Sequence, residues 1–385
     1  MTQKELNQPR VPDVGVPVAT ASTPAEDIGT VLTVRRLMWI KFSKNRIAVV
    51  SGVVLIVMYL VMAFAEFFAP YEFRNPHRDF LHHPPQRLRF FDEGGQFHLR
   101  PFVYRTYGAR DPNTFLFVYR EDTEQRDHIR FFVRGDAYRM WFWESDRHFF
   151  GVEEGHVFLF GTDLRGRCML SRIILGSRVS LTVGLIGVTI TVLLGSVLGT
   201  LSGYFGGRID NLIQRVIELI RSFPQLPLWM ALSAAIPPTW PSNYVYFGII
   251  MVLSLIGWTG LAREVRGKVL SMRNMDFVLA AESSGAGTGR LVFVHMIPNM
   301  ASHIIVTATL GIPIMILGES ALSFLGLGIK PPLTSWGLLL SQAQRIEVLR
   351  LYPWLLIPGV FIFIAVLAYN FLGDGLRDAV DPFSS

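Results

Sequence analysis

Residues 179–201 read VSLTVGLIGVTITVLLGSVLGTL, with no charged side chain. A helix needs about 20 apolar residues to cross ~30 Å of hydrocarbon, so this stretch predicts a transmembrane helix. Residues 47–68, 244–261, 296–317 and 351–372 meet the same test or nearly so. One such segment could be a buried helix of a soluble protein, but five in one chain predict an integral membrane protein.

Residues 209–236 predict a sixth, less regular span. They begin with charged residues, become apolar from Phe223, and contain Pro224 and Pro227. Proline breaks a helix in water, whereas inside a membrane bundle neighbouring helices can satisfy the freed carbonyl groups. We expect the charged first half of this span to lie at or beyond the cytoplasmic interface.

The positions of Lys and Arg predict the orientation of the chain. Five of them lie between Arg35 and Arg46, before the first span, so we expect a cytoplasmic N-terminus. With six spans the C-terminal tail is cytoplasmic too, as is the connection of residues 262–297, which holds five more. The external connection of residues 237–243 has no charge. The charge pattern and the number of spans therefore agree.

The composition fits this class. The 385 residues are 50% apolar and have a formal charge of +6, as expected for a membrane protein with a large polar part. Because the Lys and Arg residues flank predicted spans, they indicate a membrane surface rather than nucleic acid. The single cysteine, Cys168, excludes an intramolecular disulfide and a CxxC metal or redox site.

Two polar regions flank the first span, which we place with an interfacial segment in residues 31–70. Residues 1–30 lack the apolar core of a signal peptide, and we expect a disordered cytoplasmic tail. Residues 71–160 combine balanced charge with strand-like aromatic runs at residues 115–119 and 128–133. We therefore predict a small β-rich extracytoplasmic insert between the first and second spans.

The connection of residues 262–297 contains DFVLAAESSG, ending at Gly285, and then HMIPN, starting at His295. Small residues such as Ala280 and Ala281 let a short helix lie close against another surface, and Gly285 permits a turn forbidden to bulkier residues. This segment predicts a docking element for a cytoplasmic partner. The alternative is a tight loop with a C-capping glycine.

This segment resembles the conserved cytoplasmic "EAA" loop of ABC importer permeases, in its peptide-importer form. The matching residues are Ala280, Ala281, Gly285, His295, Pro298 and Asn299. Leu279 stands where the family has glutamate, a departure common among peptide-importer permeases. In that family a short coupling helix inserts into a groove of the ATPase subunit. The resemblance therefore implies that these six residues form the ATPase-coupling loop.

Further motifs of the same family extend over residues 35–382, except for the insert. The matching signature residues are Gly161, Thr162, Asp163, Gly166, Arg167, Gly206, Gly207, Gly373, Asp374 and Arg377, and Cys168 replaces the usual Asp. The resemblance implies an all-α integral membrane protein with six transmembrane helices in the MetI-like fold. Residues 161–385 would form the permease core.

Some of these motif residues also have purely structural interpretations. Gly206 and Gly207 can form a tight turn, and Asp374 can end a helix with Gly373 and Gly375 as breakers.

Other polar residues outside the coupling loop have competing interpretations. We expect Asp163, Arg165 and Arg167 to form a solvated charged rim. His303 inside a predicted span is a functional candidate, but we favour packing with a hydrogen bond to a neighbouring helix.

The sequence predicts neither a metal site nor an ATPase in this chain. Seven of the nine histidines lie in the insert, but no HxH or HxxxH cluster with carboxylates occurs. A phosphate-binding loop needs GxxxxGK followed by Ser or Thr, whereas Gly267 and Lys268 are followed by Val269. We expect no cofactor on this chain, which is not an enzyme. ATP and Mg would bind to partner subunits.

The resemblance implies a permease subunit in the inner membrane of a bacterium, or the cytoplasmic membrane of an archaeon. It would form the translocation path for peptides with a paralogous permease, two ATPase subunits and an extracytoplasmic substrate-binding protein. Nickel complexes, opines and peptide antibiotics are alternative substrates. An ion-coupled secondary transporter would need intramembrane carboxylates or a broken-helix ion site, and the four predicted spans without a charged residue argue against it. A membrane receptor would not need the docking loop.

Overall fold

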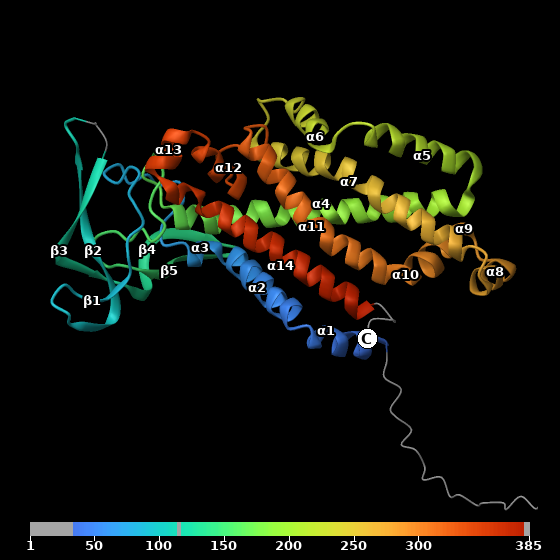
Figure 1. The fold of residues 1–385 in the computed structure, drawn as a ribbon, viewed down its shortest axis with the longest axis horizontal. Helices are drawn as coiled ribbons and strands as arrows, with labels where there is room; N and C mark the ends of the chain where they lie inside the picture. The colour runs from blue at the N-terminus through green and yellow to red at the C-terminus, as the bar shows by residue number, and fades with distance from the viewer. Residues whose placement is uncertain (1–33, 114–116, 381–385) are drawn as a thin grey trace, which may run out of the picture.

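The computed structural model describes residues 34–113 and 117–380. Its helices form an elongated bundle, and its strands gather at one end of that bundle (Figure 1). Three predictions fall outside the described residues: the tail at residues 1–30, the start of the strand at residues 115–116, and the last part of the C-terminal signature at residues 381–382.

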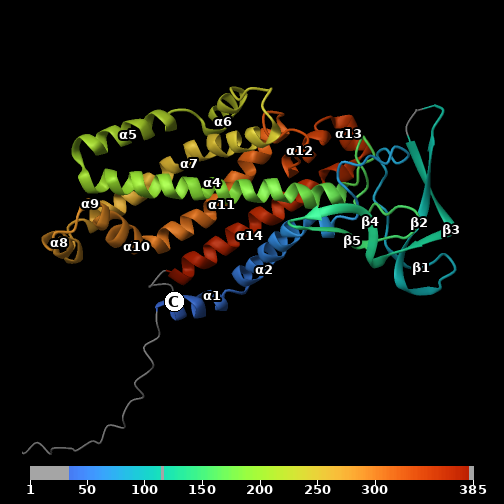
Figure 2. The ribbon, with the colours of Figure 1, turned by 180° about the vertical axis from the view of Figure 1, so that it is seen from behind.

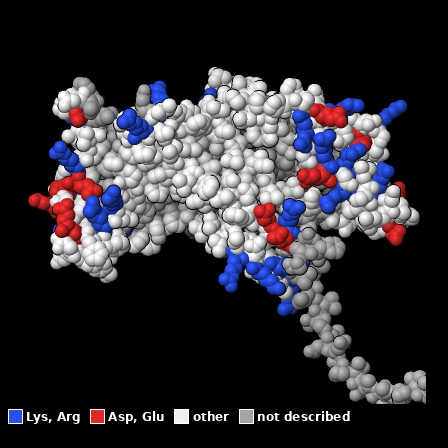
Figure 3. Space-filling model, viewed as in Figure 1, with Lys and Arg blue, Asp and Glu red and all other residues white. Residues whose placement is uncertain are grey.

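Five helices within the described residues are long and apolar enough to cross a membrane. They are α2 (Arg46–Ala63), α4 (Met169–Phe205), α7 (Ser242–Met272), α11 (Ala301–Phe324) and the segment Pro353–Val380, which joins the 3-10 turn η3 (Pro353–Leu356) to α14 (Ile357–Val380). Large apolar side chains of α2, such as Val53 and Ile56, are exposed on the outside of the bundle. Among the described residues on the face shown in Figure 3, charged side chains gather at the ends and leave the middle largely uncharged. This distribution suits a lipid-facing belt.

The predicted sixth span is not one helix. Residues 209–236 divide between α5 (Gly207–Arg221) and α6 (Gln225–Ala234), and neither piece meets the length of a membrane span. The break has a local cause, because Pro224 cannot donate a backbone hydrogen bond and restricts the backbone of Phe223. Within residues 34–113 and 117–380, five continuous helices meet the length of a membrane span, against the six that the sequence predicted.

Shorter elements cover both ends of the bundle. The end opposite the strands holds α8 (Asp276–Ser283), α9 (Thr288–Arg290), the π-helix η1 (Leu291–Met296) and α10 (Ile297–Asn299) (Figures 1 and 2). Two short helices flank α2, namely α1 (Val34–Lys44) and α3 (Ala65–Phe68). Near the strands, the chain between α11 and α14 forms α12 (Trp336–Leu340), η2 (Ser341–Ala343) and α13 (Ile346–Leu351).

The small β region lies between α3 and α4 in the sequence. One antiparallel sheet has the order β1 (Arg89–Phe91), β2 (Phe97–Arg110), β3 (Phe117–His128), and a separate hairpin pairs β4 (Arg130–Met140) with β5 (Trp143–Gly151). The predicted strand at residues 128–133 contains the corner between β3 and β4. At this corner Ile129 is buried with Val103 and Val157, so a tertiary contact divides the aromatic run into two strands.

Two glycines near the end of α14 allow close helix packing. A Cβ at Gly373 would lie 2.5 Å from the Leu310 side chain of α11, and one at Gly375 would overlap Ala48 of α2. Small residues at such contacts bring membrane helices close enough for extensive van der Waals contact. Interpreting Gly373 and Gly375 as helix breakers is therefore wrong, since α14 continues to Val380.

Candidate functional site

The predicted docking element is a short helix, α8, at the end of the bundle (Figures 1 and 2). Two backbone hydrogen bonds close its C-terminus, from Gly285 N to the Glu282 carbonyl (2.9 Å) and from Ala286 N to the Ala281 carbonyl (3.0 Å). Gly285 has a φ of +82°, the left-handed conformation that such a cap requires. The predicted turn is confirmed, and Gly285 is also a C-capping glycine.

One side of α8 packs on the bundle and the other side is free. Val278 is fully buried, and Ala281 packs with it against a cluster from α7, η1 and α11. Ala280 is exposed, and the larger Phe277 and Leu279 are 38% and 46% exposed. The two predicted alanines therefore differ, because Ala281 holds α8 on the bundle whereas Ala280 belongs to its free surface.

The His295, Pro298 and Asn299 motif shapes the turn that leads into α11. The π-helix η1 ends at Met296, two residues before Pro298, which has no N–H to continue regular helical bonding. The Asn299 side chain donates from Nδ2 to the His295 carbonyl at 2.6 Å. Pro298 and Asn299 are exposed and His295 is half-buried, so the motif lies at the surface near α8.

An ion pair joins α5 to α7 at the same end. Arg266 donates from Nε and Nη2 to the two carboxylate oxygens of Asp210, both at 2.6 Å. Ser202 of α4 donates to the same carboxylate at 2.5 Å. Gly206 and Gly207, with φ of +63° and +54°, form the predicted turn between α4 and α5. A bidentate pair has a defined geometry, so it fixes α5 relative to α7.

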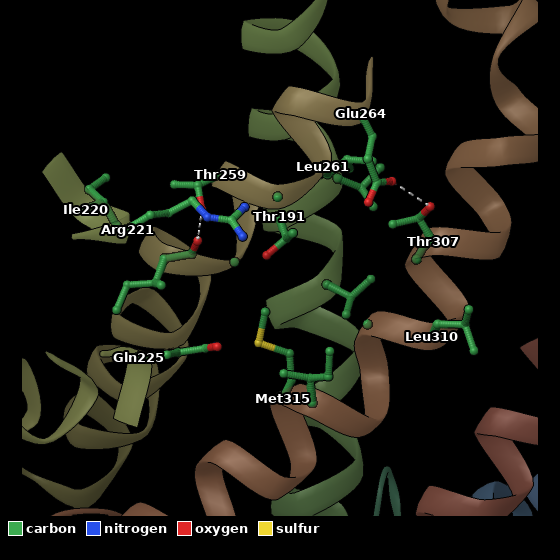
Figure 4. A pocket seen from close by; sticks show the side chains of 18 of the residues that line it. Thr191, Ile220, Arg221, Gln225, Thr259, Leu261, Glu264, Thr307, Leu310 and Met315 are labelled. Carbon is green, nitrogen blue, oxygen red and sulfur yellow. Dashed lines mark hydrogen bonds between the residues drawn. The ribbon is translucent and has the colours of Figure 1, made fainter. Parts of the chain in front are cut away.

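A cavity of about 570 Å³ lies between α4, α7, α11 and the break between α5 and α6. Its wall is mainly apolar, and its polar side chains are Thr191, Arg221, Gln225, Thr259, Glu264 and Thr307 (Figure 4). An apolar cavity with a few convergent polar groups is typical of a ligand site. The sequence analysis did not identify it, because its wall comes from segments far apart in the sequence.

Two charged residues face this cavity from different walls. Arg221, at the end of α5, and Glu264 of α7 lie on opposite sides of it in Figure 4. Thr307 of α11 donates to Glu264 at 3.3 Å, and His303 Nε2 lies 3.2 Å from the same carboxylate. The structure thus places His303 against a neighbouring helix. Ionisable groups within membrane helices usually face a protein interior or a water-filled cavity, and Arg221 and Glu264 line this cavity.

At the opposite end, the signature that begins at Gly161 forms a tight turn before α4. Gly161 and Gly166 have φ of +70° and +74°. A Cβ at Gly161 would lie 2.5 Å from the His83 carbonyl oxygen, and one at Gly166 would overlap the His77 carbonyl. Both glycines are therefore required by conformation and by close backbone contact.

Thr162 ties three parts of the chain together within this turn. Its Oγ1 accepts a hydrogen bond from the His83 amide at 2.8 Å and donates to the Phe80 carbonyl. Trp354 of η3 donates from its ring to the Thr162 carbonyl at 3.0 Å. The start of the β region, the turn and η3 are thus held as one unit.

Asp163 is fully buried, so the predicted solvated rim is wrong for this residue. It accepts hydrogen bonds from the amides of Arg165 and Arg167 at 2.8 and 2.9 Å, and from the guanidinium groups of Arg167 and buried Arg172. Burial alone would raise the pKa of Asp163, but the charges of Arg172 and Arg167 outweigh it, and the pKa lies below its ordinary value. Arg165 alone of the predicted rim is exposed.

The C-terminal signature likewise contains both buried and exposed residues. Gly373 is buried at the contact with α11, whereas Asp374 and Arg377 are exposed on α14. This part of α14 lies near α1 (Figure 1).

The sequence analysis missed a buried carboxylate in α11. Glu319 is 0% exposed and accepts hydrogen bonds from Ser323 at 2.6 Å and from Ser180 of α4 at 3.3 Å. Ser180 in turn accepts from the Trp336 amide of α12 at 3.0 Å. The predicted span stopped at residue 317, just short of Glu319. An ionisable residue beside an apolar run was the available signal, and here it joins three helices.

Two family descriptions match the sequence. "Binding-protein-dependent transport system inner membrane component" matches residues 195–384, and "N-terminal TM domain of oligopeptide transport permease C" matches residues 33–85. The first match includes α8 and most of the cavity wall. Residues 86–194, which neither description covers, include all the described strands.

Curated relatives give similar matches. The oligopeptide transport system permease protein OppC of Haemophilus influenzae is 44% identical over 231 residues, which are 60% of this chain and 71% of that protein. The protein of the same name from Bacillus subtilis is 40% identical over 224 residues, 58% of this chain and 71% of its own length. The dipeptide transport system permease protein DppC of Bacillus subtilis is 41% identical over 224 residues, with coverage of 58% and 68%.

Proposed function

Because the chain belongs to the oligopeptide and dipeptide permease family of binding-protein-dependent transport systems, we propose that its cavity forms half of a peptide path through the membrane. The chain is a permease subunit of a peptide ABC importer and is not itself an enzyme. The cavity supports this role chemically. Its apolar wall tolerates varied side chains, while Arg221 and Glu264 offer opposite charges to the two ends of a peptide. A paralogous permease would supply the other half of the path.

We further propose that α5 and α6 together make the sixth crossing. Arg221 and Gln225, from the two sides of the break, both line the cavity. Broken helices are tolerated at membrane depth where they line a cavity or pack in protein, and transporters place substrate sites beside them.

The free surface of α8 is proposed to contact an ATPase subunit. Met275, Phe277 and Leu279 are 46%, 38% and 46% exposed, beside the small Ala280. Large apolar groups gathered at an exposed surface mark a protein interface. ATP and Mg would be bound by the two partner ATPase subunits. Closure of those subunits on ATP would shift the bundle between two states through their contacts with α8.

The proposed orientation places α8 and both termini in the cytoplasm and the β region outside, beside a substrate-binding protein. Two observations support it. The β region and α8 lie at opposite ends of the bundle (Figure 1). On the face in Figure 3, Lys and Arg gather at the end that holds α8, as cytoplasmic loops do.

Thiol labelling tests the orientation. An impermeant thiol reagent applied to intact cells is expected to label Gly94→Cys, in the turn between β1 and β2, and to spare Ser284→Cys, which is exposed beside α8. Native Cys168 is buried and gives a low background. Labelling of Ser284→Cys with none of Gly94→Cys would overturn the orientation.

Uptake tests the substrate. Cells that lack the chain are expected to lose uptake of labelled dipeptides or oligopeptides, and the native chain should restore it. The tagged chain should co-purify with ATPase subunits and a second permease. Restored uptake of a nickel complex or an opine, with peptide uptake unchanged, would contradict the peptide assignment.

A further inference from the structure

The β4–β5 hairpin exposes a cluster of aromatic side chains at its tip. Trp141, Phe142 and Trp143 are 70%, 88% and 77% exposed. Hairpin turns favour Gly, Asn and Asp, which tolerate positive φ. Here Trp141 has a φ of +57°, which bulky residues rarely adopt. Large apolar side chains exposed on a strained turn indicate a surface that lipid or another protein covers.

The hairpin packs against the outer end of the first span. The ring of Phe149 in β5 lies 5.8 Å from that of Phe67 and 5.2 Å from that of Phe68, both in α3. Phe132 of β4 lies 6.0 Å from Phe67 and is itself 60% exposed. The exposed aromatic surface of the hairpin therefore begins where α2 and α3 end.

This contact also gives the direction of the tip. Side chains along β5 alternate between two faces, so Trp143 shares the face of Phe149, which touches α3. In Figures 1 and 2 the hairpin extends from the β region along the bundle, beside α3. It therefore continues the exposed apolar surface of α2 and its C-cap, where Leu60 and Phe64 are 52% and 41% exposed.

We propose that the β4–β5 hairpin rests in the interfacial layer of the lipid bilayer, with Trp141, Phe142 and Trp143 among the headgroups and upper acyl chains. Trp is enriched in this layer, because its ring is apolar and its N–H can stay hydrated. The surface is continuous with the lipid-facing side of α2, which favours lipid over a protein as its cover. The choice of leaflet depends on the proposed orientation of the chain. The contact with lipid does not depend on that orientation.

Charged residues beside the tip suit the same position. Arg139 and Arg147 are exposed near it, and long basic side chains can reach lipid phosphates while their stems lie on apolar surface. Glu144, opposite Arg139 in the hairpin, and Asp146, 3.7 Å from Arg134, would keep the rest of the hairpin out of the hydrocarbon. The hairpin would thus hold the β region at a fixed height above the bilayer.

Quenching of a fluorescent label tests this contact in the full chain. Phe142→Cys would carry an environment-sensitive label in nanodiscs of phosphatidylcholine and phosphatidylglycerol. Leu99→Cys in β2 is the matched control, because Leu99 is 85% exposed and Phe142 is 88% exposed. We expect spin-labelled lipid to quench position 142 several-fold more than position 99, and aqueous iodide to quench in the opposite order.

Two results would overturn the proposal. Equal iodide quenching at both positions, without lipid quenching at 142, would place the tip in water. Protection of position 142 from both quenchers would mean that a protein covers it. As a label-free measurement, a photoactivatable phospholipid should attach to the native chain within residues 139–144 and not within residues 97–101.

Discussion

The two ends of the bundle use their family motifs in opposite ways. Near the strands, Asp163 is fully buried between arginines, and a side chain at Gly166 would overlap a carbonyl of the same chain. At the other end, Ala280 is exposed, and a Cβ at Gly285 would meet no described atom within 4 Å. A motif that packs on its own chain is explained by folding. Ala280 packs on nothing in the described part of its own chain, which leaves it available to a partner.

The largest expected effect is at the buried end. Asp163→Asn keeps the shape of the side chain but leaves the buried guanidinium of Arg172 without its counter-charge, which typically costs about 3–5 kcal/mol. We expect a large loss of folded protein, measured by thermal unfolding after extraction from membranes. Arg165→Gln is the control, because Arg165 is exposed and its stability should not change. Equal stability of the native chain and Asp163→Asn would show that the pair is not structural.

A pH dependence that arises from buried histidines is expected at the strand end. His83 is buried among aromatic rings, and this burial lowers its pKa to about 4; burial also lowers the pKa of His77 and His156. The unfolded chain binds these protons at about pH 6.5, so stability is highest above that pH and falls as the pH drops towards 4. For His83 the loss amounts to up to about 3 kcal/mol.

Hydrogen exchange can locate this effect. Amides of β2 around Val103 are expected to exchange faster, relative to intrinsic rates, at pH 5 than at pH 7, whereas those of α8 should change little. His83→Gln should reduce the pH dependence in β2. An equal change at both ends would show that the buried histidines are not its source.

A smaller effect distinguishes Gly285 from an ordinary exposed glycine. Gly285→Ala should destabilise the protein by about 1 kcal/mol, because φ is +82° although space is open. Gly267→Ala, within the C-terminal part of α7 and with equally open space, should instead stabilise it by about 0.5–1 kcal/mol. Thermal unfolding of the two variants measures both shifts. Shifts of the same sign would mean that backbone conformation does not explain Gly285.

Structural features that depend only on neighbouring residues could be predicted from the sequence. Apolar runs such as residues 179–201 predicted the long helices, and Gly285 predicted the left-handed turn, because both features follow from local chemistry. Pro224 was visible as a possible break too. We counted residues 209–236 as one span because a membrane bundle can satisfy the freed carbonyl groups, but the structure divides them between α5 and α6.

What the sequence could not show depends on contacts between distant segments. Asp163 was predicted to form a solvated charged rim with Arg165 and Arg167, yet it is fully buried and hydrogen-bonded to Arg167 and Arg172. Glu319 lies just past an apolar run, and only the fold reveals that Ser180 from α4 satisfies it. The cavity at Arg221 and the aromatic tip at Trp141 likewise have no local sequence signature.

The central claim is that the exposed surface of α8 transmits ATP energy from a partner subunit. Ala280→Arg adds volume to that surface without disturbing the bundle, since Ala280 is exposed. Overpacking of an interface costs about 1–3 kcal/mol, which weakens docking by roughly ten- to a hundredfold. Ser271→Arg adds the same charge at an exposed position at the end of α7 and is the control.

The decisive measurement is peptide uptake together with co-purification of the ATPase subunits from the same membranes. We expect Ala280→Arg to abolish uptake and reduce ATPase co-purification while the chain still inserts and pairs with the second permease, and Ser271→Arg to behave like the native chain. Full uptake and full ATPase co-purification with Ala280→Arg would contradict the account, because the exposed surface of α8 would then not be the coupling contact.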